Sequence, residues 1–415
     1  MRMSIIALAF TLFTVSIACK NNDSAIDNAQ PVSNPAVTQK QVNYDADIIT
    51  GAQQTELLLP LIKGKYIACV VNQTSTIGDK HLVDSLIASG VNIATIFAPE
   101  HGFRGTEDAG ATILNAKDTK TGLPVLSLYG NKKKPTQQDL ADVDVVVFDI
   151  QDVGARFYTY ISSLHYVMEA CAELGKPIIV LDRPNPNGFY VDGPLLDKAY
   201  SSFVGMHPIP VVHGMTIGEY AKMINGEKWL ANGVQCDLTV IPCKNYDHKK
   251  MYEVPIAPSP NLKNMRAIYM YPTLCFFEGT NVSVGRGTAK PFEIIGSPYL
   301  KNTGFEFTPM PGPGAKSPFL MHTKCYGYDF SAKSMDEVQQ GKIDIQLLLK
   351  IYQEFEPKDK FFLENNFFNK LAGSAELMMQ LKGGLSEEEI RLSWQDDITT
   401  FKKVRKQYLL YPDFE

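Results

Sequence analysis

Three segments of this chain place acids, amides and arginines directly after short apolar runs. The segments read ATIFAPEHGFRG, VVVFDIQDVGARFYTY and IIVLDRPNPNG. Their polar residues are Glu100, His101 and Arg104 in the first, Asp149, Gln151, Asp152, Arg156 and Tyr158 in the second, and Asp182, Arg183 and Asn185 in the third. A single acid after a strand commonly caps the next helix. Three such loops together instead predict a polar pocket that can bind a hydroxylated, anionic ligand.

A fourth segment, FFEGTNVSVGRGTAKPFE, has the same character further along the chain. It places Glu278, Asn281, Arg286 and Glu293 among small residues, as expected of a loop that approaches a ligand closely. Its Gly-rich run VGRGT lacks the Lys-Ser or Lys-Thr of a phosphate-binding loop. We therefore interpret this segment as the opposite wall of the same pocket.

The sequence lacks the motifs of several common chemistries. It has neither a G-x-S-x-G elbow nor an H-E-x-x-H pair, which disfavours the commonest serine hydrolases and zinc peptidases. His322 and Cys325 form an H-x-x-C pair without a second pair nearby, so we predict no metal site. Cys69 lies inside the run YIACVV and is expected to be a buried free thiol. The chain has 40 basic and 45 acidic residues and no long basic block, which argues against nucleic-acid binding.

The scaffold that positions these loops is predicted to be an α/β sheet. Apolar runs rich in Val and Ile recur at residues 66–71, 92–97, 144–150, 177–181 and 209–212, and segments with helical periodicity such as 81–89 and 161–174 separate them. Near-continuous apolar strands that alternate with helices predict a Rossmann-like parallel sheet covered on both faces. The first run continues as VVNQTSTIG rather than G-x-G-x-x-G, so we expect no dinucleotide and no other cofactor.

The pattern changes from about residue 238. Strand-like stretches (LTVIPC and CFFEGTNVSVG) then mix with Pro-Gly loops, and helices are predicted over residues 343–355 and 386–408. A chain of 415 residues has room for two domains and needs no disulfide to hold a core. We predict a Rossmann-like domain with a parallel sheet over residues 48–228 and a mixed α+β domain over residues 229–415.

The N-terminal segment has the pattern of an export signal. Arg2 precedes an apolar run over residues 5–17 that is too short to span a bilayer. The run ends at Ser16-Ile17-Ala18-Cys19, which resembles a bacterial lipoprotein cleavage site. We expect residues 1–19 to be the signal peptide, Cys19 to carry a lipid, and residues 20–47 to be a flexible linker. The protein is then exported and anchored to a membrane, in the periplasm or at the outer membrane, with simple secretion as the alternative.

Six motifs in fixed order give the chain a family resemblance. PEHGFRG, DIQDVGARFYTY, LDRPNPNG, HGMTIGEYA, EGTNVSVGRGT and SWQDDITTFKKVRKQYLLY together resemble the NamZ-type exo-β-N-acetylmuramidases, a bacterial family formerly known only as a domain of unknown function. The similarity extends over about residues 51–411. It implies a Rossmann-like domain and a C-terminal domain that closes the cleft holding the active site. It also implies release of N-acetylmuramic acid from the non-reducing end of peptidoglycan fragments, as in cell-wall recycling.

The resemblance also implies roles for the polar residues. Glu100 is the expected general acid, and the second group is a carboxylate (Asp149, Asp152 or Glu278) or the acetamido oxygen of the substrate, oriented by an Asp and a Tyr. The residues expected to bind the substrate are His101, Arg104, Gln151, Arg156, Tyr158, Asp182, Arg183, Asn185, Asn281 and Arg286. The lactyl carboxylate of the sugar requires a cation, and the candidates are Arg104, Arg156, Arg183 and Arg286. We favour Arg156 and Arg286 because they come from opposite walls, with Arg104 and Arg183 holding the carboxylates in place as the alternative.

Two other functions use the same polar cleft. One is a lipoprotein that binds muropeptides without catalysis, and the other is a wall esterase or deacetylase that leaves the glycosidic bond whole. The expected partners are peptidoglycan-derived oligosaccharides of N-acetylmuramic acid and N-acetylglucosamine, and the membrane through the lipid. We expect no obligate protein partner.

Overall fold

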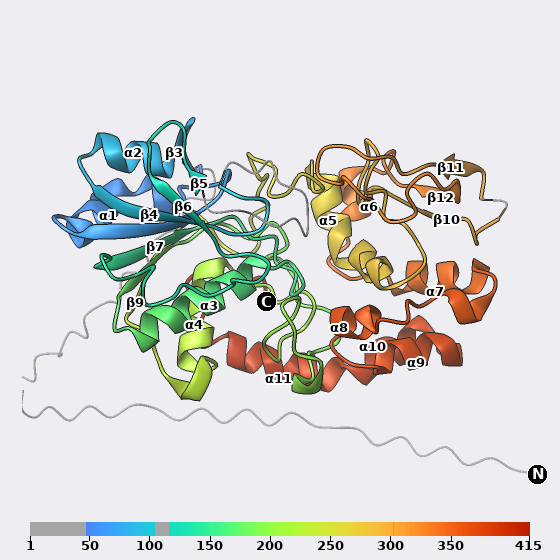
Figure 1. Cartoon of the computed structure of the whole chain (residues 1–415). Helices are drawn as coiled ribbons and strands as arrows, with labels where there is room; N and C mark the ends of the chain where they lie inside the picture. The colour runs from blue at the N-terminus through green and yellow to red at the C-terminus, as the bar shows by residue number, and fades with distance from the viewer. Residues whose placement is uncertain (1–46, 104–115, 302) are drawn as a thin grey trace, which may run out of the picture. The chain divides into compact units, whose positions relative to one another are not determined.

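A seven-stranded sheet carries three of the four polar segments. The computed structural model describes residues 47–103, 116–301 and 303–415. The strand order across the sheet is β5-β6-β4-β1-β7-β8-β9, and only the short β5 pairs antiparallel within this described sheet (Figure 1). The strands are β1 (Tyr66–Val71), β4 (Asn92–Ala98), β5 (Ala116–Lys117), β6 (Pro124–Ser127), β7 (Val145–Asp149), β8 (Ile178–Leu181) and β9 (Leu238–Ile241). The predicted parallel α/β sheet is therefore confirmed.

Helices cover both faces of this sheet because its strands are apolar on both sides. In β1, Ile67, Cys69 and Val71 pack with α1 (Thr55–Ile62) and α2 (Leu82–Ala88). Ala68 and Val70 face the opposite cluster, which includes α3 (Tyr160–Glu173) and α4 (Ile217–Gly226). Cys69 is a buried free thiol, as predicted. A small hairpin of β2 (Thr76–Ile77) and β3 (Lys80–His81) follows β1.

Two predicted strands differ from the structure. Residues 209–212 form no strand and make only isolated bridges through Val212, because Pro210 has no N–H to donate to a ladder. The stretch LTVI is a strand as predicted, but as β9 it pairs with β8 in the large sheet. The sheet thus continues beyond residue 228, where we placed the domain boundary, and the division itself stays a prediction.

The second half of the chain mixes a small sheet with helices, as predicted. An antiparallel sheet has the order β10 (Ile294–Ser297), β12 (Cys325–Asp329), β11 (Phe305–Phe307). The helices are α5 (Met265–Leu274), α6 (Met335–Val338), α7 (Ile345–Glu354), α8 (Phe367–Ala372), α9 (Glu376–Gly383), α10 (Glu387–Ser393) and α11 (Gln395–Arg405). The short 3₁₀ turns are η1 (Gly51–Gln53), η2 (Lys198–Tyr200), η3 (Ala231–Gly233), η4 (Cys275–Gly279) and η5 (Lys358–Lys360).

Two details of this half differ from the prediction. The stretch CFFEG forms η4 rather than a strand, directly continuing α5. The helix predicted over residues 386–408 is two helices, α10 and α11, which meet at Trp394. Trp394 is buried and leaves helical geometry, so its side chain packs into the core at the junction.

Candidate active site

The topology of the sheet brings the polar loops to one edge. The chain runs from β1 outward to β4 and β6, and then returns to β7, β8 and β9 on the other side of β1. Ligands of such sheets bind beyond the carboxyl ends of the strands where the order reverses. The loops after β4, β7 and β8 lie at that edge of the sheet. They contain Glu100, Asp152 and Arg183 respectively.

Glu100 is held at this edge by the first residues of α3. It follows β4 and is partly exposed, and the Thr159 hydroxyl donates to its Oε2 at 2.9 Å. The Tyr160 hydroxyl donates to the Pro258 carbonyl at 3.2 Å and lies 3.4 Å from the Glu100 carbonyl. The carboxyl group thus has a fixed position beside the helix N-terminus.

His101 ties the same loop to a segment from later in the chain. It is buried, its backbone is left-handed with φ of 69°, and its Nε2 lies 3.1 Å from the Ser259 hydroxyl. The Tyr158 hydroxyl donates to the neighbouring Pro258 carbonyl at 2.8 Å. Glu100, His101 and Tyr158 are therefore brought together, as the sequence predicted, around Pro258 and Ser259.

Asp152 is a buried carboxyl. Among the described residues, no cationic side chain lies within hydrogen-bond distance of it. Its Oδ2 accepts the Gly154 N–H at 2.7 Å, and its Oδ1 has no hydrogen-bond partner in the described part of the chain. His213 Nε2 lies 3.9 Å from Oδ2. Burial raises the pKa of Asp152 to about 7.

Tyr160 lies near both Glu100 and Asp152. Its ring packs edge-on against Tyr158 at 4.9 Å between centroids. Burial, then Glu100, and more weakly Asp152 raise the pKa of its hydroxyl, so Tyr160 stays neutral and donates. Two carboxyl groups and two phenols thus share one neighbourhood.

Asp149 and Arg183 form a closed ion pair. The Arg183 guanidinium donates to Asp149 Oδ1 at 2.5 Å and Oδ2 at 2.9 Å, and both side chains are buried. A bidentate pair of this kind leaves the carboxylate committed to its partner. Asp149 is therefore badly placed as a nucleophile or base, and Arg183 holds the loops after β7 and β8 together.

Three more predicted residues form hydrogen bonds with backbone groups or hydroxyls around the site. Asp182 accepts from the hydroxyls of Thr216 and Tyr411 and from the Gly218 N–H, and burial raises its pKa to about 6. The side-chain amide of Gln151 donates to the carbonyls of Asp152 and Pro184, and that of Asn185 donates to the Met215 carbonyl. These contacts shape the loops. Gln151 Oε1 is buried and has no hydrogen-bond partner among the described residues, so direct binding of the substrate by these residues stays a prediction.

Arg156 has a structural role rather than the predicted one. Its side chain is fully buried and donates to the carbonyls of Pro194, Ile209 and Leu371 at 2.6–2.8 Å. Burial lowers its pKa to about 9. Because three carbonyls occupy its Nη groups, Arg156 is not placed to bind the carboxylate of a substrate.

The fourth segment provides a partly buried ion pair and one donor group without a hydrogen-bond partner among the described residues. Arg286 Nε donates to Glu278 Oε1 at 2.6 Å, and the guanidinium lies 5.0 Å from the centre of the Phe292 ring. Arg286 Nη1 is buried and has no hydrogen-bond partner among the described residues. Asn281 instead donates to the Lys360 carbonyl at 2.6 Å, which ties this segment to η5.

An aromatic contact joins this segment to the Glu100 neighbourhood. The Tyr271 ring lies edge-on to Tyr158 at 5.8 Å and to Phe292 at 5.0 Å. Phe292 in turn lies under Arg286. The structure thus connects residues from both predicted walls through packed rings. Arg104 and Cys19 lie outside the described residues.

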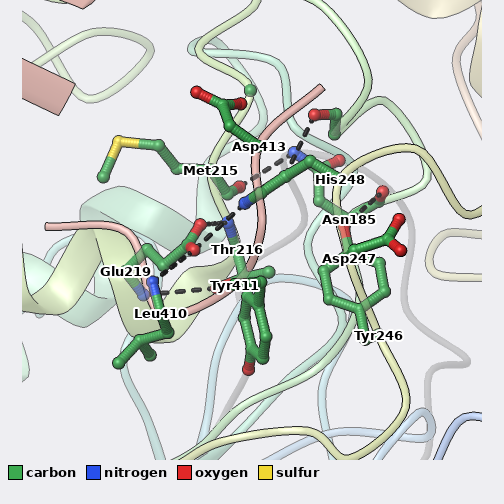
Figure 2. A network of polar contacts seen from close by, with 12 residues as sticks. Asn185, Met215, Thr216, Glu219, Tyr246, Asp247, His248, Leu410, Tyr411 and Asp413 are labelled. Carbon is green, nitrogen blue, oxygen red and sulfur yellow. Dashed lines mark hydrogen bonds and ion pairs between the residues drawn. The ribbon is translucent and has the colours of Figure 1, made fainter. Parts of the chain in front are cut away.

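Sequence reasoning missed a supporting network in which the end of the chain takes part. Figure 2 shows Glu219 of α4 between His248 and Leu410: its Oε1 accepts His248 Nε2 at 3.0 Å and the Leu410 N–H at 2.8 Å. Its Oε2 accepts the Thr216 N–H at 2.9 Å. Glu219 is fully buried. The local sequence HGMTIGEYA indicates only a capping box between Thr216 and Glu219, and the structure contains that capping box.

The segment VVNQTS also contacts the site loops, which was not predicted from the sequence. Asn72 and Thr74 follow β1 at the centre of the sheet, and the Thr74 hydroxyl accepts the Gln151 N–H at 3.0 Å. Tyr160 and Ser259 were missed as well, because no sequence spacing shows that they converge on the loop after β4. The position of VVNQTS directly after a strand was the available signal.

Two cavities lie beside the site. One of about 610 Å³ is lined by Thr76, Arg183 and Tyr252, and one of about 640 Å³ by Met251, Asn264 and Tyr269, among others. Glu100 lines neither cavity. The position of the site is therefore defined by the side chains that converge around Glu100 and Asp152. Within the described ranges, no three His, Cys, Asp or Glu residues are grouped as metal ligands, and no helix is long and apolar enough to cross a membrane.

Comparisons with known proteins identify the family. The N-terminal and C-terminal sequence models of exo-β-N-acetylmuramidase NamZ match residues 67–266 and 269–411. The peptidoglycan β-N-acetylmuramidase NamZ of Bacillus subtilis (strain 168) is 40% identical over 368 residues, which cover 84% of this chain and 88% of that protein.

Two solved structures of DUF1343 family proteins from Bacteroides fragilis NCTC 9343 are also similar. One is 48% identical with a TM-score of 0.83 and covers 89% of this chain and 100% of its own. The other is 30% identical with a TM-score of 0.74 and covers 88% of this chain and 99% of its own. Matches over both halves, together with the order of the six motifs, lead to one conclusion: this chain belongs to the NamZ family of exo-β-N-acetylmuramidases.

Proposed function

We propose that this protein is an exo-β-N-acetylmuramidase that hydrolyses the terminal, non-reducing N-acetylmuramic acid of peptidoglycan fragments. The observation that carries the proposal is that two carboxyls, Glu100 after β4 and Asp152 after β7, lie near Tyr160 at the carboxyl edge of the sheet, where the Tyr160 hydroxyl contacts the Glu100 backbone carbonyl. Glycoside hydrolysis needs two such groups beside the scissile bond. The activity named for the Bacillus subtilis relative supports the same reaction.

Glu100 is the general acid in this proposal. It is the partly exposed carboxyl of the pair, so it can reach the oxygen of the bond to the next sugar. Thr159 holds one of its oxygens, which fixes the direction of the proton transfer. The proton leaves Glu100 for the leaving-group oxygen as the bond from C1 to that oxygen breaks.

Asp152 is the base that assists the substrate's own acetamido group. Of the three acids proposed for the second role, Asp149 is bound by Arg183 and Glu278 by Arg286, whereas Asp152 has a free oxygen among its described contacts. The acetamido oxygen attacks C1, and Asp152 takes the amide proton. In the second step water attacks C1 as the bond from C1 to the acetamido oxygen breaks, Glu100 takes a proton from the water, and Asp152 returns its proton to the nitrogen. The neighbouring Tyr158 and Tyr160 fit the phenol that such a route needs.

The enzymatic assay uses a chromogenic β-N-acetylmuraminide and the matching glucosaminide. We expect hydrolysis of the muraminide, and a loss of about 10² or more in kcat for Glu100→Gln, the range expected of a lost general acid. Binding of muropeptides without release of chromophore would instead indicate a binding lipoprotein. Release of acetate or of an ester group with the glycosidic bond intact would indicate a deacetylase or esterase.

Participation of the acetamido group can be measured separately. Replacing the N-acetyl group of the muraminide by mono-, di- and trifluoroacetyl groups weakens the attacking oxygen, so kcat/KM should fall steeply along the series. In Asp152→Asn the overall rate should fall while the variant stays folded, because the base is lost. A flat fluorine series with normal hydrolysis would assign the second role to a carboxylate, acting either as the nucleophile or as the base that activates water.

We also propose that the protein acts as a membrane-anchored lipoprotein outside the cytoplasm. The charged start, the short apolar run and Cys19 support this location. Peptidoglycan fragments are extracytoplasmic in origin, so the location suits the substrate.

A further inference from the structure

A third cavity lies where α9, the junction between α10 and α11, and the loop before η2 meet. It has a volume of about 370 Å³, and its apolar lining includes Leu196, Leu377 and Trp394. None of the residues that line it belongs to the candidate active site. The proposed mechanism therefore makes no use of this cavity.

A buried amide in the cavity wall has an acceptor without a partner. Gln380 is 8% exposed, and its Nε2 donates to Glu376 Oε1 at 3.1 Å and to Ser393 Oγ at 2.9 Å. The Ser393 hydroxyl donates its own hydrogen to the Ile390 carbonyl at 2.7 Å, and a carboxylate only accepts, so these contacts fix which end of the amide is the nitrogen. Gln380 Oε1 has no hydrogen-bond partner among the described residues. A buried acceptor left open in this way favours a ligand that brings a donor.

A donor without a partner lies on the next residue of the same wall. Trp394 follows Ser393 directly, is 4% exposed and lines the same cavity. No hydrogen bond to its indole N–H occurs within the part of the chain that the structure describes, although a buried indole N–H usually has a partner. An open acceptor and an open donor beside apolar side chains match a secondary acetamide, which has one N–H, one C=O and a methyl group.

The rim of the cavity provides acceptors for hydroxyl groups. Asp197, Glu376 and Asp397 are exposed, and none of the three carboxylates forms an ion pair among the described residues. Glu376 and Asp397 lie in the first turns of α9 and α11, where acids also stabilise the helix N-terminus. That role explains the acids but not the open groups of Gln380 and Trp394. Together, the rim and the wall suit a ligand that has both hydroxyl and amide groups.

We propose that this cavity is a second, non-catalytic binding site for a sugar ring that carries an acetamido group. The acetamido N–H donates to Gln380 Oε1, its carbonyl oxygen accepts from the Trp394 indole, and its methyl group packs on Leu377. The ring hydroxyls donate to the carboxylates of the rim. The site goes beyond the proposed function, because it binds a glycan without cutting it.

Trp394 provides a local probe, because the chain has only two tryptophans. The protein is labelled with 5-fluorotryptophan, and Trp229→Phe assigns the two fluorine signals. Trp229 packs on the His207 ring at 4.6 Å between centroids and does not line the cavity. The methyl β-glycoside of N-acetylglucosamine should shift the Trp394 signal in a saturable manner and leave the Trp229 signal in place. Methyl β-glucoside lacks the acetamido group and should bind about tenfold more weakly.

Substitutions test the polar groups of the site. Gln380→Met keeps the length of the side chain and removes the open acceptor, so Kd for the N-acetylglucosaminide should rise by about tenfold. Asp397→Ala removes a rim carboxylate and should raise this Kd by about threefold. Asp396→Ala is the matched control, because Asp396 lies in the same first turn of α11 and is exposed but does not line the cavity. The control should leave Kd unchanged.

A Trp394 signal that does not respond to the N-acetylglucosaminide would overturn the proposal. Equal affinities for the two glycosides would also overturn it, because the acetamido group would then have no receptor. The pair Asp397→Ala and Asp396→Ala decides the matter even where Gln380→Met does not fold, and equal Kd values in that pair would count against the site. The titration needs no hydrolysis, so a protein without muramidase activity would remove the proposed function and leave this site testable.

Discussion

Arg286 is the cation best placed to recognise a substrate carboxylate. One side of its guanidinium is held by Glu278 and its plane lies over Phe292, which fixes the orientation of the remaining donors. Nη1 is buried without a hydrogen-bond partner in the described residues. N-acetylmuramic acid differs from N-acetylglucosamine by a lactyl carboxylate, and a planar donor pair matches that group.

Arg286→Lys should therefore reduce the preference for the muraminide. The substitution keeps the charge beside Glu278 but removes the planar fork, so KM for the muraminide should rise by about tenfold, with little change for any glucosaminide hydrolysis. The steady-state constants for both glycosides give the result. Arg266→Lys is the control, since Arg266 is similarly exposed and pairs with Glu293 at 3.2 Å. Equal selectivity in Arg286→Lys and wild type would require another group to recognise the lactyl carboxylate.

At the scale of residues, the sequence predicts which polar residue types follow the strands better than it predicts the hydrogen-bond partners of each side chain. Arg156 and Arg286 read alike in the sequence, since each follows an acid in a Gly-containing loop. Folding separates them, because Arg156 is fully buried and its Nη groups donate to three carbonyls contributed by loops and α8, whereas Arg286 is partly exposed and its Nη1 has no hydrogen-bond partner among the described residues. Partners more than a hundred residues away, such as Leu371, leave no local pattern.

At the scale of elements, the strands were predictable where apolar runs were long and free of proline. β1, β4, β7 and β8 follow such runs, and they carry the predicted loops. The strand predicted for the run that contains Pro210 is absent, because Pro210 has no backbone N–H to donate. β6 was not predicted, because its apolar pattern is short and weak. The parallel sheet was therefore predictable from the sequence, whereas the order of its strands and the place of β9 in it were not.

Buried polar contacts between α3 and α4 belong to this scale as well, and they connect Tyr220, His207, His165 and Glu169 in that order. His165 and Glu169 are four residues apart on α3, so one helical turn brings them together. His207 comes from a loop and Tyr220 from α4, and only the packing of α3 against α4 aligns all four. Sequence could have predicted the first pair alone.

At the scale of the whole molecule, the expected lipid decides where the enzyme acts. Residues 1–46 lie outside the described structure, so the location rests on the signal pattern and Cys19. Mass spectrometry of the mature N-terminus should detect a diacylglyceryl adduct on Cys19, and Cys19→Ala should remove the adduct and deplete the protein from the membrane fraction. A wild-type protein that is soluble and carries no lipid would contradict this location.

The last residues of the sequence complete the core around the large sheet. The Tyr411 hydroxyl donates to Asp182, the Leu410 N–H donates to Glu219, and Asp413 pairs with Arg405, which itself binds the Gly214 carbonyl. Without these residues, buried Asp182 and Glu219 each lose a partner, at about 1–3 kcal/mol per unsatisfied group. The halves matched by the two family models are therefore linked thermodynamically: the chain should unfold in one cooperative transition, and neither half should be fully stable as a separate fragment.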